Sequence, residues 1–358
     1  MNADIRQMLV DQAVRLLDAE AGLERLRGLL EEPGSFDRVL WGKAIEMGWP
    51  AITAPEAAGG LELSLSALAD LMRELGRRTA SLPLVPGHVA VAALTRAGIE
   101  SELVGSLAAG ERIAALALCE AGESGLEPAA RFADGRIDGV KAAVAFGAVA
   151  DVALVSAQGS DGPGLYLVDL SGNGVRRDIE NMIDNARAAA TLRLEGASAT
   201  PVLAGRDALL DMAAHAAVLT AWEQVGGSER CLEIAVAYAK ERKVFGQPIG
   251  AFQAIKHKLA DMYQEVEIAR GCAIDATEAL EAGRADFLAL ACTARLGAGA
   301  AYDFCGRECI QAHGGIGVTW EAEPHHHYRR ARALALETGA TPFWRELLVG
   351  GRQELEAR

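Results

Sequence analysis

Residues 241–262 read ERKVFGQPIGAFQAIKHKLADM and stand between two stretches in which apolar residues recur with the period of a helix. The upstream stripe contains Leu209, Met212, Ala216 and Leu219, and the downstream stripe contains Ile255, Leu259, Met262, Val266 and Ala269. A third stretch, at residues 287–312, is rich in Ala and Gly, which lets helices approach closely. The chain after Gly205 is therefore predicted to form a bundle of long helices.

Two further regions precede this bundle. Up to about Gly110 the apolar residues recur at three- and four-residue steps, which predicts helices joined by a turn-rich connection at residues 51–63. From about Ile113 to Leu203 the pattern changes to short apolar runs and alternation between turn signals, which favours short antiparallel strands in a small β-barrel or sandwich. The predicted domains are a helical domain at residues 1–112, a middle β domain at residues 113–204 and a helical bundle at residues 205–358.

Composition excludes several classes of function. The 358 residues include 35 Lys and Arg against 49 Asp and Glu, and a net charge of −14 argues against a nucleic-acid partner. No apolar run approaches the roughly 20 residues of a membrane span. The first residues resemble neither a secretory signal nor a transit peptide, so a cytoplasmic location is expected. The six cysteines include no Cys-x-x-Cys pair, which predicts reduced and mostly buried thiols.

Three segments resemble the acyl-CoA dehydrogenase family. PEAAGGLELS at residues 55–64, with a helix ending RELGRR at residues 73–78, resembles the family's amino-terminal helical domain. ERKVFGQP at residues 241–248 is similar to its Arg-x-x-Phe-Gly-x-Pro segment, and QAHGGIG at residues 311–317 to its Gln-x-x-Gly-Gly-x-Gly segment. The match spans almost the whole chain and implies a mainly α fold with a middle β domain and FAD as the cofactor.

The resemblance also implies a reaction. Family members remove an α-proton and a β-hydride from an acyl-CoA thioester, leaving a trans double bond and reduced FAD. The α-proton requires a carboxylate, since a thioester α-hydrogen is too weak an acid for water to remove. Glu321, four residues after Gly317, is the matched candidate for this base, and Glu323 is close enough to take its place. In some members the base lies at the position of Ala216, which cannot act as one.

Five residues are predicted to contact FAD. Arg242 can pair with a pyrophosphate through its guanidinium, and Phe245 offers an apolar face near an adenine. In the family these contacts come from a neighbouring subunit. Gln311 would contact the adenosine half, and Gly314 and Gly315 would let the backbone approach a ligand closely. Each also has a structural interpretation: an exposed helix-end cation for Arg242, a polar helix-end residue for Gln311 and a helix-ending turn for the glycines.

The middle domain departs from the family pattern. Where members have Thr-Glu-Pro with Gly-Ser-Asp, and later Trp-Ile-Thr, this chain has CEAGESG at residues 119–125 and KAAVAFGA at residues 141–148. Val144 replaces an aromatic flavin contact and Phe146 replaces a hydroxyl. The segment LETGATPFW at residues 336–344 also lacks the usual Glu-Gly-Thr.

These departures resemble subunits of heteromeric acyl-CoA dehydrogenases, a branch associated with bulky substrates such as steroid side chains. An alternative hypothesis follows, in which the chain is a non-catalytic partner. It would lend Arg242, Phe245 and Gln311 to FAD bound mainly by its mate. Otherwise the resemblance implies an acyl-CoA substrate, a homo- or hetero-oligomer such as a tetramer, and a flavoprotein as electron-transfer partner.

No metal site is assigned. Consecutive helical residues point about 100° apart, so the run His325-His326-His327 cannot converge on one ion, and a solvated or interfacial helix is favoured. Cys305, Cys309 and His313 share a helical face, but this spacing is typical of core packing. Trp320 could equally line an acyl pocket or belong to a core.

Overall fold

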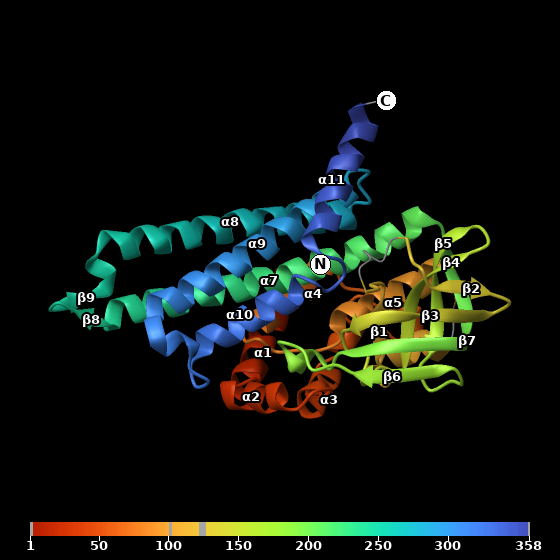
Figure 1. The fold of residues 1–358 in the computed structure, drawn as a ribbon, viewed down its shortest axis with the longest axis horizontal. Coiled ribbons are helices and arrows are strands. Elements are labelled where there is room, and N and C mark those ends of the chain that lie inside the picture. The colour runs from red at the N-terminus through yellow and green to blue at the C-terminus, as the bar shows by residue number, and fades with distance from the viewer. Residues whose placement is uncertain (1–2, 100–101, 122–126, 357–358) are drawn as a thin grey trace.

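The computed structural model describes residues 3–99, 102–121 and 127–356, and it has three parts (Figure 1). A group of helices comes first, a β-barrel follows, and a bundle of long helices completes the chain. The first group comprises α1 (Ala3–Glu20), α2 (Leu23–Glu31), α3 (Arg38–Glu46), α4 (Leu65–Arg77), α5 (Leu84–Arg96) and α6 (Glu102–Ala108). The bundle comprises α7 (Arg206–Glu241), α8 (Gln253–Glu281), α9 (Phe287–His313), α10 (Glu323–Leu334) and α11 (Thr341–Glu356). This confirms the predicted fold class, mainly α with a β domain.

The barrel is a seven-stranded sheet that closes on itself. Its strands are β1 (Ala114–Ala117), β2 (Arg131–Ala133), β3 (Arg136–Val144), β4 (Val152–Gly159), β5 (Gly162–Asp169), β6 (Val175–Ile179) and β7 (Ala190–Ala204). The ring is closed because β4 pairs with both β2 and β5, while β3 and β5 both pair with β7. The predicted antiparallel arrangement is wrong for two pairs of strands, because β1 and β2 both run parallel to β4. Alternating apolar residues indicate a strand but do not give its direction.

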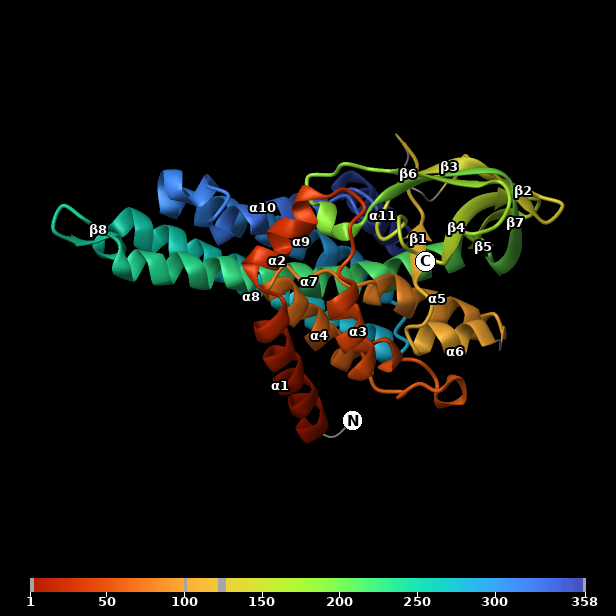
Figure 2. The same ribbon diagram turned by 90° about the horizontal axis from the view of Figure 1, so that it is seen from below.

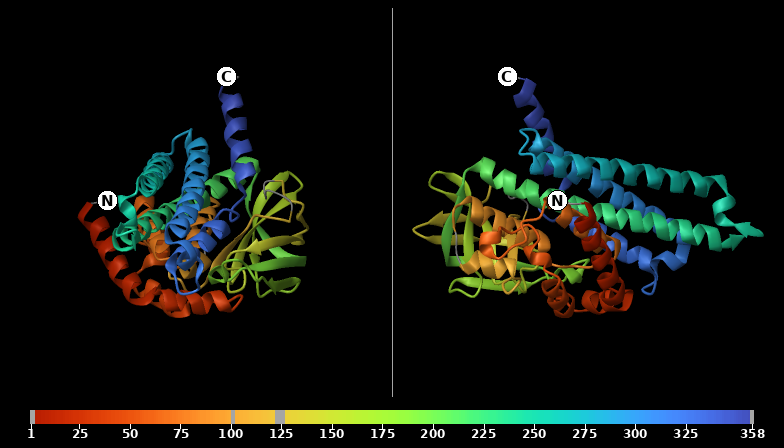
Figure 3. Two further views of the ribbon diagram at one scale, coloured as in Figure 1. Left: turned by 60° about the vertical axis from the view of Figure 1, so that its left-hand side comes forward. Right: turned by 180° about the vertical axis from the view of Figure 1, so that it is seen from behind.

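The bundle is built around α7, a helix of 36 residues that spans about 54 Å at 1.5 Å per residue. α8 and α9 lie beside it, and a hairpin of β8 (Lys243–Val244) and β9 (Gln247–Pro248) joins α7 to α8 at the end far from the barrel (Figures 1 and 3). The hairpin was not expected from the helical pattern. None of the helices within the described ranges combines the length and apolar character that crossing a membrane requires.

The first helices pack tightly on the bundle because glycines remove side chains at the crossing of α4 and α7. A Cβ added to Gly76 would lie 1.9 Å from the carbonyl oxygen of Glu223, and one added to Gly226 would lie 1.9 Å from that of Arg73. Either atom would overlap the neighbouring backbone, so only glycine permits this approach. α4 therefore lies directly against α7, and α5 and α6 follow it toward the barrel (Figure 2).

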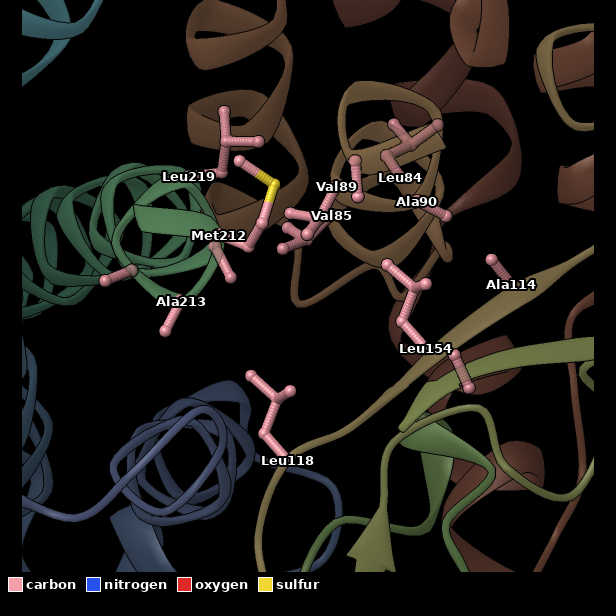
Figure 4. Packing of buried hydrophobic residues seen from close by; sticks show 14 of the residues in the cluster. Leu84, Val85, Val89, Ala90, Ala114, Leu118, Leu154, Met212, Ala213 and Leu219 are labelled. Atoms are coloured by element: carbon pink, nitrogen blue, oxygen red, sulfur yellow. The ribbon is translucent and has the colours of Figure 1, made fainter. Parts of the chain in front are cut away.

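A continuous apolar core joins the three parts. Figure 4 shows Val85 of α5 and Met212 of α7 directed toward one another, with Leu118, which follows β1, on the barrel side of the same cluster. Val85 and Leu118 at this junction also line the cavity described below.

Candidate functional site

A cavity of about 260 Å³ lies where the barrel meets α5, α7 and the segment after α10. Its lining is mainly apolar. Contributors include Val85 and Pro86 of α5, residues 142–146 at the end of β3, Thr220 of α7, and residues 336–340 after α10. The cavity therefore joins all three parts of the chain, as small-molecule sites often do at domain junctions.

Three carboxylates line this cavity, and each is bound to a cation. Glu337 accepts from Arg187 at both oxygens, with Nε to Oε1 at 2.8 Å and Nη2 to Oε2 at 2.6 Å. Glu120 is paired with the buried ammonium of Lys141. Asp184 is paired with the guanidinium of Arg330.

The same cations connect the cavity to a buried network beneath it. Arg330 is fully buried and donates to Glu223 Oε1 at 2.9 Å, and Arg187 Nη1 lies 3.3 Å from the same oxygen. Burial alone would lower the pKa of Arg187, but the charges of Glu223 and Glu337 outweigh it and raise that pKa. Both guanidinium groups therefore stay charged.

The backbone around the cavity is strained at non-glycine residues. Ala143, Phe146 and Thr338 have φ values of 47°, 59° and 57°, in the left-handed region that side chains disfavour. All three line the cavity. Strain of this kind is found where surrounding structure imposes it, often at ligand sites, so it marks the cavity as a candidate site.

The predicted cofactor contacts do not lie at this cavity. Arg242 follows the last residue of α7, and about 30 Å of helix separates it from Thr220 at the cavity wall. Arg242 is exposed, and Phe245 at the tip of the β8–β9 hairpin is 93% exposed with a φ of 51°. Side chains presented in this way can contact a molecule bound outside this chain's own cavity.

The structure brings the other predicted cofactor contacts to the same end of the bundle. The ring of Tyr238, near the end of α7, stacks on His313 at the end of α9, with ring centroids 4.0 Å apart. Gln311, Gly314 and Gly315 surround that end of α9 and are exposed. Gly314 has a φ of 62° and a ψ of −142°, a combination that is essentially limited to glycine. We call this region, residues 242–245 together with residues 311–315, the distal surface.

Glu321 also lies at the distal end. It is exposed and precedes α10, and its carbonyl oxygen accepts from Arg27 Nη2 at 2.7 Å. Ala333, at the cavity wall, is ten residues beyond Glu323 along α10, about 15 Å away. General-base catalysis needs hydrogen-bond reach of about 3 Å, and Glu321 is exposed and does not line the cavity, so its role as the base stays a prediction. Glu323 does not line the cavity either, and it is bound to Arg230.

Other sequence expectations have mixed outcomes. Val144 and Phe146 are buried and line the cavity, whereas residues 122–125 of the segment CEAGESG lie outside the described residues. The solvated alternative for the histidine run is wrong for His326 and His327, which are buried within the chain, and the interfacial alternative is not tested. His327 is held by the hydroxyl of Tyr302, with O to Nδ1 at 2.9 Å.

Trp320 packs in a small cluster with Leu26, Leu30 and Ala186 and does not line the cavity. Cys305 and Cys309 are buried in a core cluster, as their spacing predicted. Sequence reasoning missed Arg187 and Glu337. The available signal was an acidic residue in the otherwise uncharged run LETGATPFW, at the place where the family pattern was interrupted.

Comparisons with known proteins agree with this architecture. Two family models match, "Acyl-CoA dehydrogenase, N-terminal domain" at residues 4–102 and "Acyl-CoA dehydrogenase, C-terminal domain" at residues 204–349. The chain is 32% identical to the acyl-CoA dehydrogenase IpdE2 of Mycobacterium tuberculosis over 332 residues, which cover 92% of each protein.

Solved structures of related proteins have the same fold. A chain of the Tcur3481-Tcur3483 steroid ACAD variant is 31% identical, with a TM-score of 0.93 over 99% of both chains. A chain of the ChsE4-ChsE5 complex from Mycobacterium tuberculosis is 27% identical, with a TM-score of 0.90 over 99% of this chain and 98% of that one. The resemblance predicted from the sequence is confirmed, and the chain belongs to the acyl-CoA dehydrogenase family.

Proposed function

We propose that this chain takes part in FAD-dependent α,β-dehydrogenation of an acyl-CoA as one of two related chains in a heteromeric enzyme. In this assembly it contributes the distal surface to FAD held mainly by its mate, and the mate supplies the base. A bulky acyl group is the proposed substrate class and a separate flavoprotein the proposed electron acceptor. The similarity to chains of two-chain complexes, one of them described as a steroid ACAD, supports this choice.

The proposal rests on one observation, which is that the carboxylates lining the cavity are paired with cations. Glu120, Asp184 and Glu337 are the acidic residues among the described side chains that line the cavity, and each is engaged by Lys141, Arg330 or Arg187. A carboxylate paired with a cation is a poorer proton acceptor, because protonation weakens the charge-assisted bonds of the pair. Among the lining residues that the structure describes, every carboxylate is therefore already paired with a cation.

The volume of the cavity also supports the proposal. Ligand pockets usually enclose roughly 300–1,000 Å³. At about 260 Å³ this cavity falls below that range. We therefore propose that this cavity does not hold a flavin ring system and a bulky acyl group together.

The distal surface fits the elongated, anionic half of FAD. Arg242 would pair with the pyrophosphate, Phe245 would pack on the adenine, and Gln311 would donate or accept at the adenosine. A Cβ added to Gly314 or Gly315 would meet nothing within 4 Å, so the backbone there is open to a ligand. When bound, FAD supplies hydride acceptance from the substrate's β-carbon.

Flavin content tests the proposal. The chain should be nearly colourless when expressed alone and purified. Co-expressed with a related acyl-CoA dehydrogenase chain from its own organism, it should co-purify as a yellow complex. The measurement is visible flavin absorbance per chain. A chain that alone retains one tightly bound FAD would contradict the proposal and support autonomous catalysis.

A second candidate, catalysis in the chain's own cavity, is favoured by one observation: Glu337 lies at the cavity wall. Two substitutions in the yellow complex separate the candidates. Glu321→Gln and Glu337→Gln should each leave turnover within about twofold of the unmodified complex, because neither carboxylate is the mate's base. Turnover would be followed with an artificial electron acceptor. A loss of more than about 100-fold in Glu337→Gln alone would establish the second candidate, and the same loss in Glu321→Gln would restore Glu321 as base.

A further inference from the structure

A histidine from α5 meets a histidine from α7 inside the chain. Nε2 of His88 lies 3.5 Å from Nδ1 of His215, and the two rings are stacked with their centroids 5.7 Å apart. The side chain of His215 is 14% exposed, and the ring of Phe287 from α9 packs against it in a T-shaped arrangement. We call the contact between the two histidines the histidine joint. It belongs to neither the cavity lining nor the distal surface, so the proposed function does not use it.

The hydrogen bond in the histidine joint requires one donor and one acceptor. A neutral imidazole has one N–H and one nitrogen lone pair, so one ring donates to the other. Thr53 Oγ1 lies 2.7 Å from Nδ1 of His88, and a hydroxyl can either donate or accept there. Both rings are therefore satisfied while they are neutral. If both rings were protonated, two N–H groups and two positive charges would face each other, which would break the bond.

The charged groups around the histidine joint do little to favour a proton on it. Within the described residues, the carboxylate that faces the joint is Asp211 of α7, whose Oδ2 lies 3.9 Å from Nε2 of His215. This carboxylate is already paired with Arg96 of α5. A small cavity beside His88 is lined by Arg112, a further cation, and by uncharged residues. An imidazolium formed here would therefore have no carboxylate of its own.

Burial keeps the histidine joint neutral. Desolvation, together with the neighbouring His215, lowers the pKa of His88 to about 3, and desolvation lowers the pKa of His215 although Asp211 opposes the change. A histidine open to water has a pKa of about 6.5. An opened joint therefore takes up protons at a higher pH than the packed one. The packing is at its most stable above about pH 6.5 and loses stability as the pH falls from there toward 3.

The histidine joint lies directly beside one wall of the cavity. His88 is one turn after Val85 on α5, and His215 is one turn after Met212 on α7. Val85 and Met212 face each other between the two helices, and Val85 lines the cavity (Figure 4). A change at the joint is therefore transmitted to the packing of α5 on α7 at the cavity wall.

We propose that the histidine joint makes the contact between α5 and α7 sensitive to acid, so that protonation of His88 and His215 loosens this wall of the cavity. Each ring takes a proton from solvent on its nitrogen lone pair, and no covalent bond between heavy atoms breaks. At neutral pH the hydrogen bond holds the two helices together. At acidic pH the two imidazolium groups repel each other across the same contact. The joint needs neither FAD nor a mate, so the proposal is independent of the proposed function.

Hydrogen–deuterium exchange of the full-length chain at pH 7 and pH 5 tests the proposal. Rates corrected for the intrinsic pH dependence of exchange give an equilibrium constant for opening of each helix. One histidine whose pKa falls from 6.5 to about 3 on packing should raise the opening constant of α5 by roughly 25-fold over this interval. Peptides from residues 253–265, at the end of α8 beside the β8–β9 hairpin, should change by less than about threefold.

Glutamine variants complete the test. The double variant His88→Gln with His215→Gln keeps side chains that can hydrogen-bond but takes up no proton, so the opening constant of its α5 should change by less than about threefold. His257→Gln, at an exposed position on α8, is the matched control and should keep the full acid dependence. Circular dichroism at both pH values establishes that each chain is folded. Should the double variant not fold, His88→Gln alone takes its place.

Two results would overturn the proposal. One is an unmodified chain whose α5 is equally protected at pH 7 and pH 5. The other is equal acid dependence of α5 in the unmodified chain and in the glutamine variant, because the histidine joint would then not be the group that responds to acid.

Discussion

Replacing Arg330 with alanine is expected to lower the free energy of unfolding by about 3–5 kcal/mol, the usual effect of removing one partner from a buried ion pair. The guanidinium is fully buried and donates to the carbonyl oxygens of Thr79 and Ala80 at 2.8 and 2.9 Å. It also binds Asp184 and Glu223. Without it, Asp184 and the two carbonyls lose this cation, and Glu223 keeps only Arg187. Urea denaturation followed by circular dichroism measures the loss.

Arg332 on the same helix provides a matched control. Its side chain is half exposed and paired with Asp303, an arrangement that contributes at most about 1 kcal/mol. Arg332→Ala should therefore shift the urea midpoint only slightly. Similar small shifts for both variants would mean that the network around Arg330 relaxes or admits water, and would contradict the expected role.

Replacing Arg242 with alanine should weaken FAD retention in the two-chain complex by about 10- to 100-fold, since a hydrogen bond to a charged group contributes about 1.5–3 kcal/mol. Arg242 is exposed at the distal surface and caps the end of α7. The dissociation constant of FAD from the complex, measured by fluorescence of released flavin, gives the change directly.

Lys240→Ala removes the same charge two residues earlier, from another exposed position, and should change retention by less than about threefold. If the two variants lose flavin equally, general electrostatic attraction accounts for the effect. If Arg242→Ala retains flavin like the unmodified complex, the distal surface does not contact the cofactor. Assembly should be measured separately by gel filtration, so that loss of the mate is not mistaken for loss of FAD.

Periodicity was sufficient to predict the helices and the barrel. Leu68, Leu71 and Leu75 recur at helical spacing and all are buried on α4, because one face of that helix packs on the core. Strand direction could not be predicted in the same way. β1 can pair in parallel with β4 because β2 and β3 lie between them in the sequence. The direction of this pairing depends on the path of the chain, which the alternation of apolar residues does not show.

The site was only partly predictable, because some of its contacts join residues that are far apart in the sequence. Gly314 and Phe245 could be selected from short motifs, and both lie on local turns, whereas their contact with FAD stays a prediction. Glu321 was assigned by counting from a glycine, yet α10 carries the chain about 15 Å further before it reaches the cavity. Glu337 meets Arg187 across 150 residues, and no local pattern indicates such a contact.

The position of Arg330 has a consequence for how the chain reaches its final form during synthesis. The four residues that bind Arg330 leave the ribosome well before it does. They are Thr79, Ala80, Asp184 and Glu223. Until Arg330 emerges, burying two carboxylates together is electrostatically unfavourable, so the helices and barrel already made cannot dock fully onto α7. Final closure of this protein therefore waits until α10 has joined the core and brought Arg330 to these carboxylates.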